Sequence, residues 1–209
     1  MATLSSQYQG FETLNITMVT EYVMHVKLNR PQKLNALNPR LWSEIRQCFK
    51  AIERDTSLRA VIISGEGRGF CAGIDVKEGP SELMTAAEDM SRKAYRLRSH
   101  ILDLQSAFTA IQVCDKPVIA AVHGVCIGAG VDLITACDIR YCTSDSIFSV
   151  KEVDIGMAAD VGTLQRLQKV VGSDSWVREV CLTAREFGSA EATQQGLVSG
   201  VLPDCATLF

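Results

Sequence analysis

Three acidic residues in the second half of the chain could carry proton chemistry, because each one interrupts an apolar run. Asp132 lies in the run GVDLI, Glu152 in VKEV and Asp160 in MAADVG. Removing a carboxyl group from water raises its pKa, so a carboxyl group in such surroundings can exchange protons near neutral pH. Taken together, the three residues predict acid–base catalysis.

Each acid also has a structural explanation when it is considered alone. Asp132 can cap a turn of helix, and Asp160 can occupy the N-cap position of the helix that follows it. Glu152 can pair with Lys151 or Arg140. Three acids in apolar surroundings, downstream of two possible anion-binding segments, favour the catalytic interpretation.

The two possible anion-binding segments are rich in small residues. One is FCAGIDV at residues 70–76, which follows a glycine-rich turn, and the other is GAG at residues 128–130, between a strand and a helix. Small residues let backbone N–H groups approach a ligand closely, and a helix N-terminus adds its positive dipole end. One N–H group from each segment would form an oxyanion hole. The alternative is that both are tight turns with a packing role.

Other chemistries are less well supported by the sequence. The glycines at 124, 128 and 130 follow a strand, and Glu152 lies at a suitable distance for a ribose-binding acid, but the spacing is not that of a dinucleotide-binding fingerprint. No GxSxG nucleophile motif occurs. The three histidines have no metal-binding spacing with a cysteine or an acid, and they are His25, His100 and His123. We therefore predict no metal site.

Composition bounds the class of protein. The chain has 209 residues, of which 47% are hydrophobic and 22% charged, with a net charge of −3 and no basic run, which argues against nucleic acid as a partner. No uncharged apolar run is long enough to span a membrane. The eight cysteines form no CxxC motif, and most lie in apolar runs, so we expect buried thiols in a reducing compartment. Residues 1–14 lack an apolar signal core, no arginine precedes Arg30, and the last residues do not form a peroxisomal tripeptide.

Strand and helix patterns alternate along the chain, which predicts an α/β fold. Asn38-Pro39 is typical of a helix start. The short connections suit a coiled ββα architecture at least as well as a doubly wound sheet. The expected strands lie at residues 22–28, 60–63, 118–122, 139–141 and 148–150. One expected helix begins at residue 39, and the others cover residues 81–113, 131–137, 164–171 and 176–184.

Several separated motifs in order make the chain similar to the enoyl-CoA hydratase/isomerase (crotonase) family. The likeness extends from about residue 12 to residue 204, so we treat residues 1–209 as one crotonase-like domain, a spiral of ββα units. Family members continue with further C-terminal helices, and the resemblance therefore implies a core that is C-terminally truncated, with that helical region largely missing. The motifs are LNRP at 28–31, NALN at 35–38, FCAGID at 70–75, KPVIAAVHG at 116–124, GAG at 128–130 and ACD at 136–138.

Within the family, the residues around the three acids resemble those of the dienoyl-CoA isomerases. Ordinary hydratases carry glutamate at both positions that match Asp132 and Glu152. The resemblance implies that Glu152 removes a proton from C2 of a 3,5-dienoyl-CoA, that Asp132 returns one at C6, and that Asp160 tunes the pair. Alternatives are an enoyl-CoA hydratase or a catalytically inactive CoA-binding chain.

The resemblance also implies the binding residues and the cellular setting. The thioester oxygen would lie between the N–H groups of Ile74 and Ala129, where the family has glycine at the second position. No cofactor is implied, since CoA is part of the fatty acyl substrate, and the expected context is β-oxidation by a trimeric or hexameric enzyme of mitochondria or peroxisomes. The expected substrate-binding residues are Lys33, Ala36, Ala72, Gly73, Ile74, Asp75, Val76 and Ala129.

Overall fold

The computed structural model describes residues 5–78 and 89–208 of the chain. Its main sheet has six strands in the order β1-β2-β3-β4-β6-β9. β1 and β2 are antiparallel, and every other neighbouring pair is parallel. The strands are β1 (Leu14–Met18), β2 (Val23–Leu28), β3 (Ala60–Gly65), β4 (Val118–Val122), β6 (Ile139–Thr143) and β9 (Gly200–Leu202).

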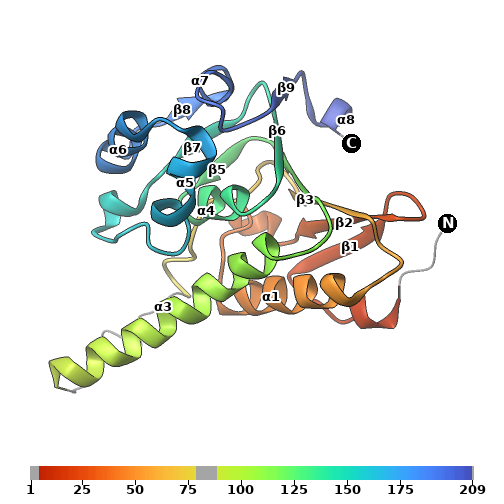
Figure 1. The fold of residues 1–209 in the computed structure, drawn as a ribbon, viewed down its shortest axis with the longest axis horizontal. Helices are drawn as coiled ribbons and strands as arrows, with labels where there is room; N and C mark the ends of the chain where they lie inside the picture. Colours follow the sequence, from red (N-terminus) through yellow and green to blue (C-terminus); the bar gives the residue numbers. More distant parts are fainter. Residues whose placement is uncertain (1–4, 79–88, 209) are drawn as a thin grey trace.

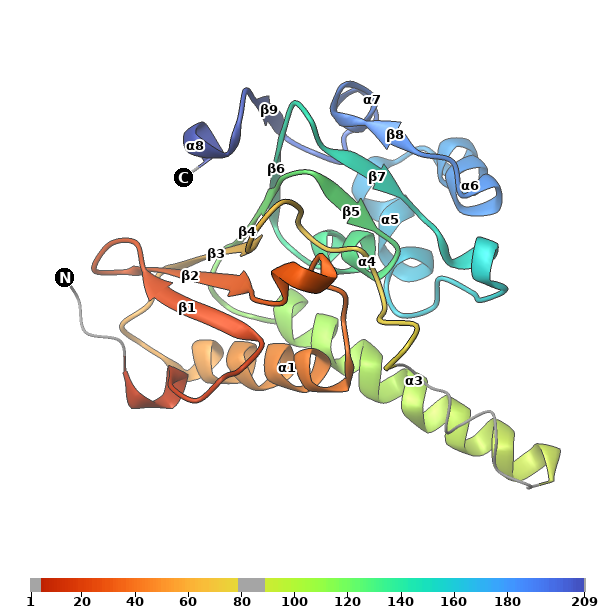
Figure 2. The same cartoon turned by 180° about the vertical axis from the view of Figure 1, so that it is seen from behind.

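A second, smaller sheet has the order β5-β7-β8, with β5 (Val125–Ile127), β7 (Ile147–Ser149) and β8 (Phe187–Gly188). The chain passes from β4 directly to β5 and from β6 directly to β7, so each turn of the chain contributes to both sheets before a helix follows (Figure 2). An isolated bridge between Cys71 and Cys126 extends the same arrangement to the segment after β3. The predicted ββα spiral is therefore confirmed.

Helices follow the strands and cover the sheets (Figure 1). α1 packs against α3, where the rings of Trp42 and Phe108 lie 4.6 Å apart. α4 packs against α5 on the other side of the molecule from β1. The helices are α1 (Pro39–Arg54), α3 (Met90–Gln112), α4 (Ala129–Thr135), α5 (Thr163–Val171), α6 (Asp174–Thr183), α7 (Ser189–Gln194) and α8 (Cys205–Leu208), and the 3-10 helices are η1 (Ser6–Tyr8), η2 (Pro31–Lys33) and η3 (Glu152–Ile155).

The expected elements are found close to their predicted bounds. Asn38 caps α1 as predicted, because its Oδ1 accepts a hydrogen bond from the Leu41 N–H at 3.0 Å. α4 begins two residues earlier than expected because Gly128, in a left-handed conformation, forms its N-cap. The expected helix over 81–113 is found from Met90, and residues 81–88 lie outside the described residues.

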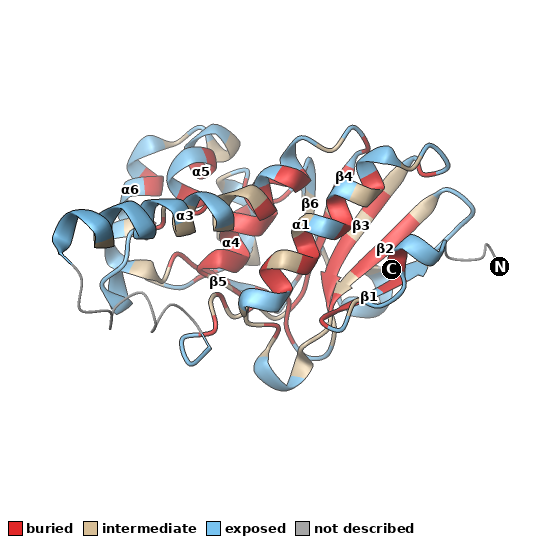
Figure 3. Cartoon of the chain, turned by 90° about the horizontal axis from the view of Figure 1, so that it is seen from below, coloured by how far each residue is buried: buried red, intermediate tan, exposed pale blue. Residues whose placement is uncertain are grey.

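Buried residues are concentrated where the helices and strands pack against one another (Figure 3). β4 is buried almost throughout, as expected for a parallel strand with both faces covered, and the largest fully buried side chains include Phe49, Phe70 and Phe148. The N-terminal half of α3 is mostly exposed. All eight cysteines are free, and five of them are buried, which agrees with the expected thiols. In the described part of the chain, no helix is both long and apolar enough to span a membrane.

One buried side chain joins the segments that lead to the site. Asn35 is fully buried, and its Oδ1 accepts a hydrogen bond from the Arg30 N–H at 2.8 Å. Its Nδ2 donates to the carbonyl oxygens of Glu66 and Gly69, both at 2.9 Å. These bonds tie the loop that contains Ala36 to the glycine-rich turn after β3.

We expect Asn35→Ala to lower the free energy of unfolding by about 3 kcal/mol, because two buried carbonyl groups and one N–H group lose their partner. Chemical denaturation measures the change. Asn38→Ala is the control, since loss of an N-cap costs about 1 kcal/mol. Equal losses for the two variants would contradict the role assigned to Asn35.

Candidate active site

The two segments expected to bind an anion lie side by side. A Cβ atom built on Gly73 would lie 3.7 Å from the backbone nitrogen of Ala129 and 3.1 Å from the carbonyl oxygen of Ile127. Gly73 has a φ of +92°, so both its conformation and its surroundings require glycine. Among the hydrogen bonds of the described residues, neither the Ile74 N–H nor the Ala129 N–H has a backbone partner. Within the described structure, neither N–H group is therefore committed to a backbone acceptor.

Glu152 lies against the second of these segments. It is the first residue of η3, and its Oε1 lies 3.3 Å from the position that a Cβ atom on Gly128 would take. Gly128 has a φ of +51° and precedes the first residue of α4. The tight approach places the Glu152 carboxyl group against Gly128, the residue before α4.

Asp132 occupies the first turn of α4 and is fully buried. Its Oδ1 accepts a hydrogen bond from the backbone N–H of Thr163, the first residue of α5. Its Oδ2 is buried and has no hydrogen-bond partner among the described residues. Asp132 therefore binds the first N–H group of a helix, as the structural explanation expected, and that helix is α5. Its second carboxyl oxygen remains available for proton transfer.

The pKa of Asp132 is raised to about 8, mainly by burial and also by the charge of Glu152. Hydrogen bonding from Thr163 and the positive charge of Arg166 act against this increase. The Asp132 carboxyl group is therefore largely protonated at neutral pH, and it can serve as a proton donor.

Glu152 is partly buried. Burial is also the main cause that raises its pKa, with a further contribution from the charge of Asp160, while backbone hydrogen bonds lower it. Its Oε2 is buried without a hydrogen-bond partner in the described structure. The alternative pairing with Lys151 or Arg140 is wrong: Lys151 pairs with Asp154 at 2.9 Å, and Arg140 donates to backbone carbonyl groups.

Asp160 lies two residues before the N-cap of α5. The expectation that it could cap this helix is wrong, because Gly162 occupies the N-cap and no side chain there accepts a bond. The Asp160 carbonyl oxygen instead accepts a hydrogen bond from Gln105 of α3 at 2.7 Å. Its carboxylate acts on Glu152 through its charge. The structure thus brings all three predicted acids to one site.

Comparisons with known proteins show the family of the chain. The family model described as "Enoyl-CoA hydratase/isomerase" matches residues 19–209. The chain belongs to this family. Among solved crotonase-family structures, the enoyl-CoA hydratase from Mycobacterium smegmatis is 30% identical with a TM-score of 0.77, and coverage is 91% of this chain and 70% of that one. The enoyl-CoA hydratase from Bacillus anthracis is 27% identical with a TM-score of 0.79, and coverage is 92% and 70%.

Curated relatives of the family carry a more specific name. The mitochondrial Delta(3,5)-Delta(2,4)-dienoyl-CoA isomerase of Rattus norvegicus is 52% identical over 93% of this chain, and that of Homo sapiens is 53% identical over the same share. The peroxisomal isomerase of Arabidopsis thaliana is 45% identical over 92% of this chain and 70% of its own length. The chain spans 60% of the length of the rat and human relatives.

The remaining residues expected to bind substrate differ in their exposure. Lys33 ends η2, is exposed, and forms no ion pair with any residue that the structure describes. Ala36 and Ala72 are partly exposed, and Val76 is 68% exposed. Asp75 differs, because its carboxylate is buried and pairs with Arg30 at 3.0 Å. Its side chain therefore shapes the loop, and contact of these residues with substrate stays a prediction.

Sequence reasoning missed the residues that support the acids. Arg30 joins the Ala36 carbonyl group to Asp75, where the sequence pattern predicted only the end of a strand. Arg166 is 9% exposed, and its guanidinium group binds Gln112 at 2.8 Å on α3. A charged residue between buried positions of a helix was the available signal for Arg166. Nothing in the sequence indicated that the Thr163 N–H would hold Asp132.

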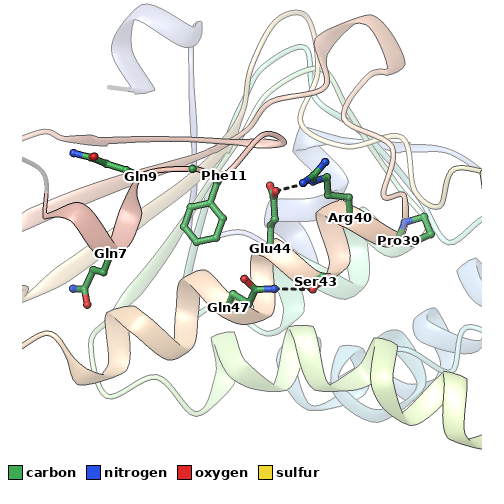
Figure 4. Close-up of a pocket in the computed structure, with 9 residues that line it drawn as sticks. Gln7, Gln9, Phe11, Pro39, Arg40, Ser43, Glu44 and Gln47 are labelled. Atoms are coloured by element: carbon green, nitrogen blue, oxygen red, sulfur yellow. Dashed lines mark hydrogen bonds and ion pairs between the residues drawn. The ribbon is translucent and has the colours of Figure 1, made fainter.

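A separate pocket of about 580 Å³ lies between the N-terminal segment and α1 (Figure 4). It is polar, and Glu44 and Arg40 form an ion pair at 3.2 Å within it. None of its lining residues belongs to the acid site. The lining consists of Gln7, Gln9, Gly10, Phe11, Pro39, Arg40, Ser43, Glu44 and Gln47.

The buried Asp132 makes stability depend on pH. Its pKa is about 8 in the folded chain against 3.8 for a solvated aspartate, so folding retains a proton that the unfolded chain releases between these values. Stability therefore falls as the pH rises through this window, by up to about 1.4 kcal/mol per pH unit. Asp132→Asn removes the titration, so its free energy of unfolding should increasingly exceed that of the wild type from pH 5 to pH 8.

Urea denaturation at several pH values measures this difference. Glu191→Gln is the matched control, because Arg185 lowers the pKa of Glu191 and the group stays ionised over the same range. Its difference from wild type should be constant between pH 5 and pH 8. A constant difference for Asp132→Asn as well would show that Asp132 is not the buried, neutral acid described above.

Proposed function

We propose that this chain carries the active site of a dienoyl-CoA isomerase that converts 3,5-dienoyl-CoA into 2,4-dienoyl-CoA in fatty acid β-oxidation. Glu152 removes a proton from C2, and Asp132 delivers one to C6. The C–H bond at C2 breaks, a C–H bond forms at C6, and both double bonds move by one position towards the thioester. The substrate undergoes no net oxidation or reduction, so the proposed reaction needs no redox cofactor.

The observation that carries the proposal is the pair of carboxyl groups, each with a buried oxygen that has no partner among the described residues, beside the two segments proposed to form the oxyanion hole. We propose that the two groups differ in protonation in the working enzyme, with Asp132, whose pKa is about 8, holding a proton and Glu152 ionised. Burial raises the pKa of Glu152 as well, and backbone hydrogen bonds act in the opposite direction. A pair of acids separated in this way can act as donor and acceptor in one turnover.

The dienolate intermediate carries negative charge on the thioester oxygen. The N–H groups of Ile74 and Ala129 are proposed to bind this oxygen, and they are fixed before substrate arrives by the close contact at Gly73. Ala129 also begins α4, whose N-terminal dipole end favours the same charge. The CoA portion is proposed to bind along Lys33, Ala36 and residues 72–76.

Location and assembly are also proposals. The relatives' names place the rat enzyme in mitochondria and the Arabidopsis enzyme in peroxisomes, and we propose one of these compartments for this protein. We propose a homo-oligomer, because the exposed half of α3 carries large apolar side chains such as Met90, Tyr95 and Leu97. Analytical ultracentrifugation tests the assembly.

The activity test uses purified chain and 3,5-dienoyl-CoA. We expect the ultraviolet absorbance of the conjugated 2,4-dienoyl product to appear, and Glu152→Gln to lower the rate by at least about 100-fold through loss of the base. Asp160→Asn should slow isomerisation and leave any hydration of 2-enoyl-CoA unchanged. A folded wild-type chain that produces no diene conjugated with the thioester carbonyl would refute the proposal, and faster hydration than isomerisation would favour a hydratase.

A further inference from the structure

Thr163 presents an unexplained polar group next to the proposed proton donor. It is the first residue of α5 and is fully buried, and its N–H already donates to Asp132 Oδ1. Its hydroxyl Oγ1 is buried and has no hydrogen-bond partner among the described residues. The Oδ2 atom of Asp132 is also buried and has no hydrogen-bond partner among the described residues. Buried polar atoms without partners are rare, and they point to a functional role.

The start of α5 is in close contact with Asp132, so the Thr163 backbone is held beside the Asp132 side chain. A Cβ atom on Gly162 would lie only 2.6 Å from the Asp132 Cβ and 3.0 Å from its Oδ1, so any larger residue at this position would push the helix away. The Thr163 side chain is also near enough to stabilise the charged form of the Asp132 carboxyl group and lower its pKa. The hydrocarbon part of a dienoyl chain offers no polar atom to the hydroxyl, whereas the Asp132 carboxyl group already binds the N–H group of the same residue.

We propose that Thr163 is a positioning residue whose hydroxyl group hydrogen-bonds Asp132 Oδ2 and presents that oxygen to the reacting carbon. This inference rests on the proposed function. The Thr163 N–H fixes Oδ1, and the hydroxyl fixes the second oxygen. Two bonds to one residue define the plane of the carboxyl group, which a single bond cannot do.

A hydroxyl group suits this task because it both donates and accepts hydrogen bonds. While Asp132 is protonated, its Oδ2–H group donates a hydrogen bond to the hydroxyl, and this hydrogen bond opens when the proton is passed to C6. When the O–H bond of Asp132 breaks and the C–H bond at C6 forms, the carboxyl group becomes charged. The hydroxyl then turns and donates to the new carboxylate, so the charge develops against a partner that is already in place.

Other groups face Asp132 from the elements around it. Glu152 of η3 and Arg166 of α5 carry charge, and the thiols of Cys71, Cys126 and Cys181 lie within electrostatic reach. Asp160 acts through Glu152. Arg166 is held by Gln112 and Thr109 on α3, so it contributes its charge, whereas the Thr163 hydroxyl belongs to the residue that already binds Asp132.

Thr163→Val tests the proposal, because valine keeps the shape and the backbone N–H and removes only the hydroxyl. We expect kcat for isomerisation to fall about tenfold with KM unchanged, and the alkaline limb of the pH–rate profile to move up by about one unit. The 13Cγ resonance of Asp132, identified by its loss in Asp132→Asn, should titrate at a higher pH by the same amount. Thr163→Ser keeps the hydroxyl and should behave like wild type.

An unchanged Asp132 titration in Thr163→Val would overturn the proposal, as would a failure of Thr163→Ser to restore it. If Thr163→Val does not fold, Thr163→Ala replaces it with the same measurements and the same expected shift. A wild-type chain without isomerase activity would sink the proposed function. The Asp132 titration would still decide whether the hydroxyl acts on this carboxyl group.

Discussion

The burial of the Asp132 carboxyl group against the start of α5 is the constraint on which the site depends. An aspartate in this position keeps its proton at neutral pH because the interior disfavours its charged form. The cost is moderated by the Thr163 N–H and by Arg166, so the group remains able to ionise during a reaction. Gly162 is required for this contact, since no side chain fits between α5 and Asp132.

The spiral architecture explains why residues distant in the sequence meet at this point. Each passage from the main sheet to the smaller sheet ends close to the site: the segment after β3 supplies Ile74, the end of β5 leads to Ala129, and the segment after β7 supplies Glu152. Glycine at 73 and 128 allows these segments to touch. The fold thus delivers two N–H groups and two carboxyl groups from three successive turns of the chain.

The sequence predicted the strands, the helices and the three acids, because apolar periodicity and buried charge are local signals. The family resemblance supplied the expected roles, and family membership is confirmed. The supporting contacts could not be read in this way. Asp132 binding to Thr163, or Arg30 joining Ala36 to Asp75, depends on how distant segments dock. The supposed N-cap at Asp160 failed for the same reason: the first amide of α5 is bound by a residue from another helix.

The central claim is that Glu152 and Asp132 divide the two proton transfers between them. The most direct measurement follows the substrate by NMR in D2O with each acid replaced in turn by its amide. The account predicts that Asp132→Asn still exchanges the C2 proton of 3,5-dienoyl-CoA for deuterium but forms no product, whereas Glu152→Gln does neither. Loss of C2 exchange in Asp132→Asn, or its persistence in Glu152→Gln, would contradict the assignment.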